Sequence, residues 1–311
     1  MNIQEHLMSI KDGAYNIKKL LPNGWHEFLP EVAIITGSAG PLELKNLIKI
    51  SRVHPIPGNI PGPKIEGHSP QMMFGHIDDV RVIWIMGRAH MNEQELSDNY
   101  SDVTMVRVLA SLGIKNYVIS SMVGSLHTDR KPGQVCLVKD HISSFVPCPL
   151  RGNPKLIGNL SPSNNLHISG ENLYSTDCRE RLREMIGGEN DKQRYPAVFD
   201  EDVVYTMIGG PQFETPSEGI LHGNLGSNIQ GMSVVREVSA IKHMIPDANI
   251  ITMCMVSNMV FTGFGSQDGN GITTLNSSVS HENNLRAVRE EDGRFAKLIH
   301  DYVANRLFEV R

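Results

Sequence analysis

The sequence contains few cysteines, and none of them form a close pair along the chain. Cys136, Cys148, Cys178 and Cys254 are widely scattered among 311 residues. Zinc sites use closely spaced cysteines, and small secreted domains use a dense disulfide framework. Neither pattern is present, so we expect free thiols in a reducing cytosol.

The sequence also lacks a strong excess of either charge. Charged residues make up 20% of the chain, hydrophobic residues make up 40%, and the net charge is -5. This composition is that of an ordinary globular protein and argues against a nucleic-acid partner. An anionic ligand would therefore have to be met by a local cluster of hydrogen-bond donors.

No apolar run is long enough to cross a bilayer, which argues against a membrane partner. Near the amino terminus, apolar residues recur at helical spacing with charges between them, which is unlike a continuous signal core. These residues are Ile3, Leu7, Ile10, Ile17 and Leu20. We expect a cytoplasmic protein whose first segment is helical.

Short β-rich runs alternate with helical patterns along the chain. Strands are predicted at residues 32–36, 80–86, 117–120, 134–138, 203–208 and 250–256. Helices are predicted at residues 102–112 and 234–245, before Gly113 and Pro246. This alternation predicts an α/β fold with a mixed or mainly parallel sheet. Residues 151–175 and 262–280 are predicted to be long loops, either lids, oligomer contacts or disordered segments.

An aromatic ring and a carboxylate stand side by side after one predicted strand. Phe213 and Glu214 follow the strand at 203–208 and precede a capped helix that starts at Thr215. Ligands of open α/β sheets bind at the carboxyl ends of strands. A flat ring beside a fixed acceptor suits a heterocycle. A packed Phe and a solvated Glu on an ordinary loop would give the same sequence pattern.

Several hydrogen-bond donors follow other strands. Arg88 and His90 alternate in an extended segment, so both could face one oxyanion. Ser233 opens a predicted helix, where it could cap the helix or touch an anion. Two further donors are Ser38, in a glycine-containing loop, and His68. A plain turn, a solvated histidine or a surface arginine would explain each of these residues singly.

The sequence carries no recognised nucleophile motif. Neither a Gly-x-Ser-x-Gly elbow nor a His-Glu-x-x-His helix occurs in it. The inventory therefore combines anion donors with a heterocycle site, and it fits a reaction in which a bound anion is itself the nucleophile.

These motifs resemble those of the trimeric, low-molecular-mass purine nucleoside phosphorylases and their methylthioadenosine phosphorylase relatives. They occur in the family's order, and the similarity extends from about Val32 to the final helix. The segments that carry it are Gly37-Ser38, Gly67-His68, Gly87-Arg88-Ala89-His90-Met91-Asn92-Glu93, Lys139-Asp140-His141-Ile142, Gly210-Pro211-Gln212-Phe213-Glu214-Thr215, Gly231-Met232-Ser233 and Ser257-Asn258.

The resemblance implies a fold, an activity and an assembly. Residues 1–311 would form a single α/β domain around a distorted, mixed central sheet, with residues 1–30 as a helical extension. The enzyme would be a pentosyltransferase of purine salvage that cleaves nucleosides with inorganic phosphate as co-substrate, without a metal or another cofactor. It would be a homotrimer in which a neighbouring subunit covers the sugar, and His167 is the aligned candidate for that contact.

The resemblance also implies roles for individual residues. Asn258, Glu214 and His90 would be catalytic. Phosphate would be bound by Ser38, His68, Arg88, His90, Met122 and Ser233. The purine would be held by Phe213, Glu214 and Asn258, and the ribose by Met232, Asn92 and His281.

The residue pair Ser257-Asn258 indicates which purine is preferred. The methylthioadenosine branch resembles Thr-Asp at this place, and an aspartate suits a 6-amino group. Asn258 together with Phe213 and Glu214 points instead to the 6-oxopurine nucleosides inosine and guanosine, in ribose or deoxyribose form.

Several positions depart from the family pattern. The loop at 37–41 ends in Pro41 and is less flexible than the family's glycine-rich loop. Met122 could crowd the space between sugar and base, Asn92 stands in place of a tyrosine, and Arg236 stands in place of a proline. The alternative is therefore a divergent paralogue that binds a nucleoside or base with altered specificity, such as for adenosine or methylthioadenosine, or with little turnover.

Overall fold

The computed structural model describes residues 1–25, 29–37, 40–63, 70–95, 97–127, 129–143, 145–152, 154–187, 193–199, 201–260 and 288–309. The described strands form one sheet in the order β2-β3-β4-β1-β5-β8-β7-β6-β9. They are β1 (Val32–Thr36), β2 (Lys49–Pro55), β3 (Gln71–Ile77), β4 (Val80–Met86), β5 (Asn116–Ser125), β6 (Val135–Ile142), β7 (Val203–Met207), β8 (Ile229–Gly231) and β9 (Asn249–Met259).

The sheet is mixed, and half of it closes on itself. Strand β1 lies between β4 and β5 and is parallel to both. Strand β9 is antiparallel to β6 and also runs parallel to β5 over most of its length, so β5, β8, β7, β6 and β9 form a ring. This closure produces the distortion that the family resemblance implied, and the expected α/β class is confirmed.

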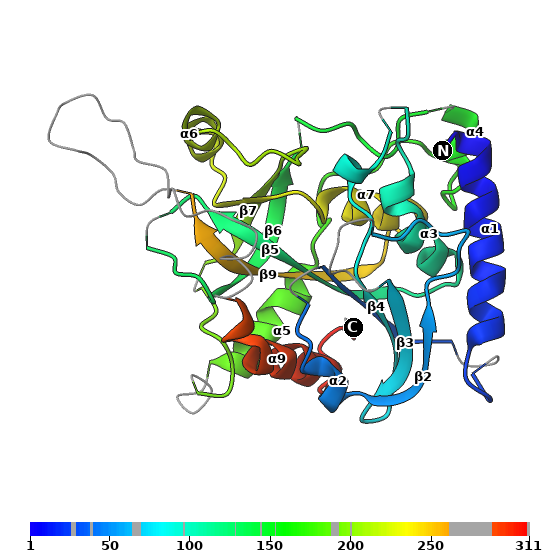
Figure 1. The fold of residues 1–311 in the computed structure, drawn as a ribbon, viewed down its shortest axis with the longest axis horizontal. Helices are drawn as coiled ribbons and strands as arrows, with labels where there is room; N and C mark the ends of the chain where they lie inside the picture. Colours follow the sequence, from blue (N-terminus) through cyan, green and yellow to red (C-terminus); the bar gives the residue numbers. More distant parts are fainter. Residues whose placement is uncertain are drawn as a thin grey trace, which may run out of the picture.

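Helices cover both faces of the sheet (Figure 1). One face packs against α1 (Ile3–Leu20), α3 (Thr104–Ser111) and α7 (Val235–Met244). The other face packs against α5 (Thr176–Ile186) and α9 (Asp292–Ala304), and the short α2 (Leu44–Leu47) lies beside α9. The remaining helical segments among the described residues are α4 (Pro154–Gly158), α6 (Pro216–Asn224) and the 3₁₀ turns η1 (Met91–Glu93) and η2 (Ser101–Val103).

The amino-terminal helix predicted from apolar spacing is α1. It begins with a capping box in which Asn2 and Glu5 bond each other's backbone N–H groups. Its buried face, which includes Ile10 and Ile17, packs in the same core cluster as residues of α3. The helix is thus tied to the rest of the protein by apolar burial. No described helix is both long enough and apolar enough to span a membrane.

Each predicted strand falls on an observed one, and β1 and β4 were predicted at their observed bounds. The strands predicted at 117–120 and 134–138 cover only the first parts of β5 and β6. Strands β2, β3 and β8 were not predicted. The side chains of β2 are mostly exposed, so it lacks an apolar signal, and β8 is only three residues long. The predicted loop at 151–175 contains the short helix α4. The predicted loop at 262–280 lies outside the described residues.

Candidate active site

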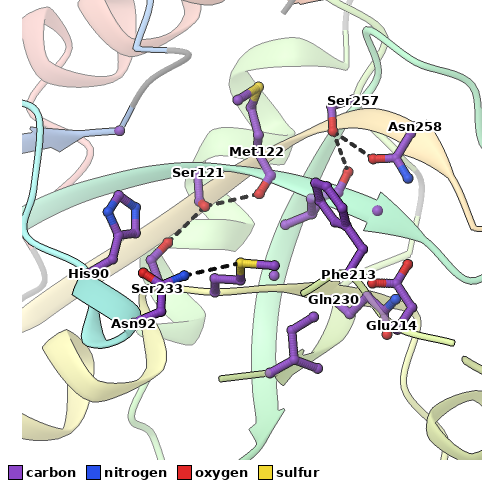
Figure 2. Close-up of a pocket in the computed structure, with 16 residues that line it drawn as sticks. His90, Asn92, Ser121, Met122, Phe213, Glu214, Gln230, Ser233, Ser257 and Asn258 are labelled. Atoms are coloured by element: carbon purple, nitrogen blue, oxygen red, sulfur yellow. Dashed lines mark hydrogen bonds between the residues drawn. The ribbon is translucent and has the colours of Figure 1, made fainter. Parts of the chain in front are cut away.

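A pocket opens where the parallel strands β1, β4, β5 and β9 end, and the end of the oppositely directed β7 also contributes to it (Figure 2). Its lining comes from the residues that finish or follow these strands, together with β8, which is the usual place for a ligand in an α/β sheet. The lining residues are Gly37, His90, Asn92, Ser121, Met122, Val123, Gly124, Ile208, Phe213, Glu214, Gln230, Gly231, Met232, Ser233, Ser257 and Asn258.

The segment between β7 and α6 carries Phe213 and Glu214 into the pocket. The helix start predicted after it is confirmed, because Thr215 and Glu218 form a capping box at α6. Gly210 has a φ of 61°, and a Cβ there would meet the Met232 sulfur at 2.5 Å. Only glycine suits that conformation and that close approach. The Phe213 side chain is 43% exposed, so part of its ring is open for contact.

Burial raises the pKa of the half-buried Glu214 carboxyl above its usual value. Its own backbone N–H and the nearby Gln230 amide act in the opposite direction, and His222 adds a smaller lowering effect. The carboxylate is therefore an acceptor whose charge depends on its immediate donors. Such a group suits recognition of an N–H on a buried ligand.

Asn258 lies one residue before the end of β9, and in Figure 2 it stands above Phe213 whereas Glu214 stands below. The hydroxyl of Ser257 lies 2.9 Å from Asn258 Oδ1 and 3.2 Å from the Val123 carbonyl oxygen. When this hydroxyl donates to Oδ1, it sets the amide so that Nδ2 is the group left to donate to a ligand. Asn258 is only 8% exposed, so such a donor would act in a partly dry environment.

Arg88 lies beneath the pocket and is 5% exposed. Its Nη1 donates to the Glu237 carboxylate at 3.1 Å and to the Ser233 hydroxyl at 3.3 Å, and its Nη2 donates to backbone carbonyls. The charge of Arg88 is thus balanced inside the protein. Burial raises the pKa of Glu237, and the charge of Arg88 opposes that rise. Arg88 reaches the pocket wall through Ser233 and is not itself among the lining residues.

The capping role considered for Ser233 is wrong. Helix α7 begins after Val234 without any side-chain cap, and the Ser233 hydroxyl instead bonds Arg88 and lies 3.0 Å from the Ser121 hydroxyl. Val234 has a φ of 76°, which is strained for a β-branched residue. This backbone turn directs Ser233 toward the pocket, so the two hydroxyls and Arg88 form a cluster of donors at one end of the site.

His90 and Asn92 line the pocket beside this cluster. The His90 Nδ1 lies 2.6 Å from the Glu93 carboxylate, which orients the ring. Asn92 Nδ2 contacts the sulfur of Met232 at 3.7 Å, and its buried Oδ1 has no hydrogen-bond partner among the described residues. These side chains therefore form a polar wall beside the donor cluster, away from the Phe213 end (Figure 2).

The expectation that Met122 crowds the pocket does not match its side-chain position. Met122 packs partly against the core cluster that contains Met255, on the α9 side of the sheet. In Figure 2 its side chain extends away from Met232 and Phe213. Alternation along β5 causes this orientation, because neighbouring side chains of a strand point to opposite faces. Met122 thus presents mainly its backbone to the pocket.

Arg236 is also accounted for by packing. It is 2% exposed and makes a two-pronged ion pair with Asp102, with N–O distances of 2.6 and 2.9 Å. It further donates to the Asn99 backbone and to the Pro147 carbonyl. The side chain thereby ties the start of α7 to η2 and to the loop at Pro147. Arg236 does not line the pocket.

Four expected site residues have other placements. Ser38, His68 and His281 lie outside the described residues. His167 is exposed and lines a separate groove with Arg151 and Ile168, so it does not reach the pocket of its own chain. Among the residues that the structure describes, no cluster of three or more His, Cys, Asp or Glu side chains could hold a metal ion.

The structure adds three residues to the site that sequence patterns did not single out. These are Ser121, Gln230 and Glu237. Ser121 and Gln230 sit in apolar-looking strands, and their orientation depends on strand register. Glu237 follows Arg236 in an ordinary helical pattern, and only the fold brings it to Arg88.

Comparisons with known proteins place the chain in a family. The profile of the phosphorylase superfamily matches residues 31–304. Purine nucleoside phosphorylase from Mus musculus is 31% identical over 225 residues, covering 70% of this chain and 72% of that protein. Purine nucleoside phosphorylase 1 from Bacillus subtilis is 28% identical over 300 residues, covering 95% and 97% of the two chains.

A solved structure extends the comparison to the whole fold. Schistosoma mansoni purine nucleoside phosphorylase in complex with inosine is 25% identical, has a TM-score of 0.78, and is covered over 96% of each chain. The pocket at the strand ends, the donor cluster at Arg88 and Ser233, and these similarities lead to one conclusion. The chain belongs to the phosphorylase superfamily and, within it, to the purine nucleoside phosphorylases.

Proposed function

We propose that this protein catalyses phosphate-dependent cleavage of the N-glycosidic bond in 6-oxopurine nucleosides, releasing the base and a pentose 1-phosphate. The observation that carries the proposal is the division of one pocket into two ends. The cluster of Arg88, Ser233 and Ser121 lies at one end, and Phe213 with Glu214 and Asn258 lies at the other. A nucleoside placed between them has its glycosidic bond near the anion.

The purine end matches the charge that develops as the bond breaks. Negative charge grows on the departing base, and an amide N–H at N7 stabilises it. Asn258 Nδ2 is the available donor because Ser257 faces Oδ1. The Glu214 carboxylate would accept the N1–H that a 6-oxopurine carries, and the partly exposed Phe213 ring would pack against the base.

The phosphate end would supply the nucleophile. Arg88 and the Ser233 hydroxyl would donate to phosphate oxygens, together with His90 and with Ser38 and His68 from the loops outside the described residues. Positive charge on the pentose would be stabilised by the phosphate below it, with Met232 and Asn92 beside the sugar. Because phosphate is the nucleophile, this reaction needs no paired carboxylates, no metal and no further cofactor.

We further propose that the active form is a homotrimer. The Phe213 side chain is 43% exposed although it lines the pocket, so the site of a single chain is incompletely covered. His167 is exposed and lines a groove separate from its own chain's pocket, so it is free to cap a neighbour's site. His281, in the segment outside the described residues, is proposed to contact the 5′-hydroxyl of the sugar.

The test is release of hypoxanthine from inosine with and without phosphate, beside guanosine, adenosine and methylthioadenosine. We expect phosphate-dependent turnover of inosine and guanosine. The variant Asn258→Ala should lose roughly 100-fold or more in kcat because it removes a donor to the leaving group. Cleavage only of adenosine or methylthioadenosine would assign the protein to the alternative specificity.

One result would refute the proposed activity. If saturating phosphate supports no turnover of any purine nucleoside while bases still bind, the protein is a binding paralogue. Ser227→Ala serves as the control, because Ser227 is 1% exposed and bonds backbone carbonyls without lining the pocket. Its activity should stay close to that of the unmodified protein.

A further inference from the structure

Gln230 is a buried amide in the wall of the purine end. It lies on β8, opposite Gly124 of β5 and Thr206 of β7, and it is 2% exposed. A glutamine in this place is costly unless its polar atoms have partners, because a buried amide loses its contacts with water. Its partners therefore indicate what the residue does.

One end of the amide is held by His222. The Nδ1 of His222 on α6 lies 2.8 Å from Gln230 Oε1, and both side chains are buried. A carbonyl oxygen only accepts, so the His222 proton must be on Nδ1 in this arrangement. The ring of His222 also packs against Phe145, with ring centroids 5.0 Å apart. The amide is oriented with its oxygen toward His222 because its NH₂ group then faces the Glu214 carboxylate, which only accepts when ionised.

The other end of the amide points to Glu214. Figure 2 shows Gln230 beside Glu214 in the pocket wall. Its Nε2 has no acceptor with ordinary hydrogen-bond geometry among the described residues, although the amide is close enough to Glu214 to favour the ionised carboxylate. Catalytic contacts are often long or poorly aligned before substrate binds. Two N–H groups are therefore held ready at the purine end of the site.

We propose that His222 and Gln230 form a relay that positions Glu214 and selects 6-oxopurines. Gln230 donates one N–H to the Glu214 carboxylate and the other to an acceptor at purine position 6. A 6-oxopurine offers an oxygen there and an N1–H to Glu214. A 6-aminopurine offers an NH₂ group to the Gln230 NH₂ and an acceptor nitrogen to Glu214, so both contacts become repulsive. This inference rests on the proposed function.

The proposed effect of Gln230 on the pKa of Glu214 differs in origin from the effects of the charged groups nearby. The titratable groups that act on Glu214 are His222 and Glu218, both on α6, and Glu218 forms the capping box with Thr215. Gln230 contributes no charge, so its effect comes from donation alone. Removing the amide while keeping its volume should therefore raise the pKa of Glu214 and leave the Glu218 capping box intact. It also removes the hydrogen-bond partner of His222, so a His222 variant is measured beside it.

The primary test needs no substrate. The pKa of Glu214 is measured by ¹³C NMR of glutamate carboxyl carbons, with Glu214→Gln used to assign the signal. In Gln230→Leu the pKa of Glu214 should rise, since the carboxylate loses a neighbouring donor that favours its ionised form. His222→Phe keeps an aromatic ring against Phe145 and should give a smaller rise. Ser227→Ala should give none.

Kinetics then separate positioning from a merely structural role. For inosine at saturating phosphate, kcat/KM of Gln230→Leu should fall more at acidic pH than at pH 8.5, since the acidic limb of the pH profile moves to higher pH when the pKa of Glu214 rises. The preference for inosine over adenosine should also fall roughly tenfold, because a hydrogen-bonded site rejects the mismatched base by at least that factor. Gln230→Glu places a second carboxylate beside Glu214 and should shift the acidic limb of the pH profile further toward high pH.

Failure of the relay and failure of the proposed function give different results. An unchanged Glu214 pKa in Gln230→Leu overturns the relay whether or not the protein is an enzyme. An equal loss at every pH and for both nucleosides also overturns it, since that is the behaviour of a packing defect. Absence of nucleoside turnover in the unmodified protein overturns the proposed function, and the NMR titration still decides whether Gln230 controls Glu214.

Discussion

The ion pair between Arg236 and Asp102 provides a sharp test of how α7 is held in place. The two side chains are 2% and 7% exposed, and two N–O contacts join them. Arg236→Ala would leave the Asp102 carboxylate buried without its partner and would also remove the bonds to the Asn99 and Pro147 carbonyls. Breaking a buried pair in this way costs about 3–5 kcal/mol of unfolding free energy.

This cost can be converted into a melting temperature. With an unfolding entropy of roughly 2.1 cal/mol/K per residue, a chain of 311 residues gives about 0.65 kcal/mol/K, so Tm should fall by ~5–8 °C. The assay is thermal unfolding followed by circular dichroism. Lys115→Ala is the matched control, because the Lys115–Asp247 pair is 58% and 69% exposed and contributes at most about 1 kcal/mol.

Two further measurements complete the test. The double variant Asp102→Leu/Arg236→Met should recover part of the lost Tm, because a buried pair can be replaced by apolar residues of similar volume. At 25 °C, Arg236→Ala should keep kcat/KM for inosine within about threefold, since Arg236 does not line the pocket. A Tm drop no larger than that of Lys115→Ala would refute the reasoning, and a large loss of kcat/KM would show that Arg236 acts on catalysis.

Two other predictions follow from side-chain placement and burial. Met122→Ala should lower the unfolding free energy by about 1–2 kcal/mol without raising turnover, because the Met122 side chain packs against a core cluster. A higher kcat in this variant would show that Met122 obstructs the pocket. Burial and the neighbouring Arg107 lower the pKa of His6 to about 2 from 6.5. Because the unfolded chain binds a proton at His6 below pH 6.5 and the folded protein does not, the free energy of unfolding decreases as the pH falls, by about 2 kcal/mol at pH 5. His6→Gln keeps an acceptor for Arg107 and should flatten urea midpoints between pH 7 and pH 5; an unchanged slope would contradict this.

Local patterns were sufficient for the main elements of the fold. The apolar runs at β1 and β4 and the capping box at Thr215 were predicted at their observed positions, because strand burial and helix capping depend on neighbouring residues. Strand β8 escaped prediction, since three residues carry too little periodicity. Its pairing with β5 and β7 exists only when distant segments meet.

The candidate site also has features that local sequence predicts and features that only the fold produces. The sequence by itself determined the chemical inventory, including Arg88, Glu214 and Asn258, because residue type and position after a strand are local properties. Tertiary structure alone decided that Ser233 bonds Arg88 instead of capping α7, that Met122 faces the core, and that His222 holds Gln230 beside Glu214. These outcomes depend on strand register and backbone direction, which set where a side chain points and which groups it meets.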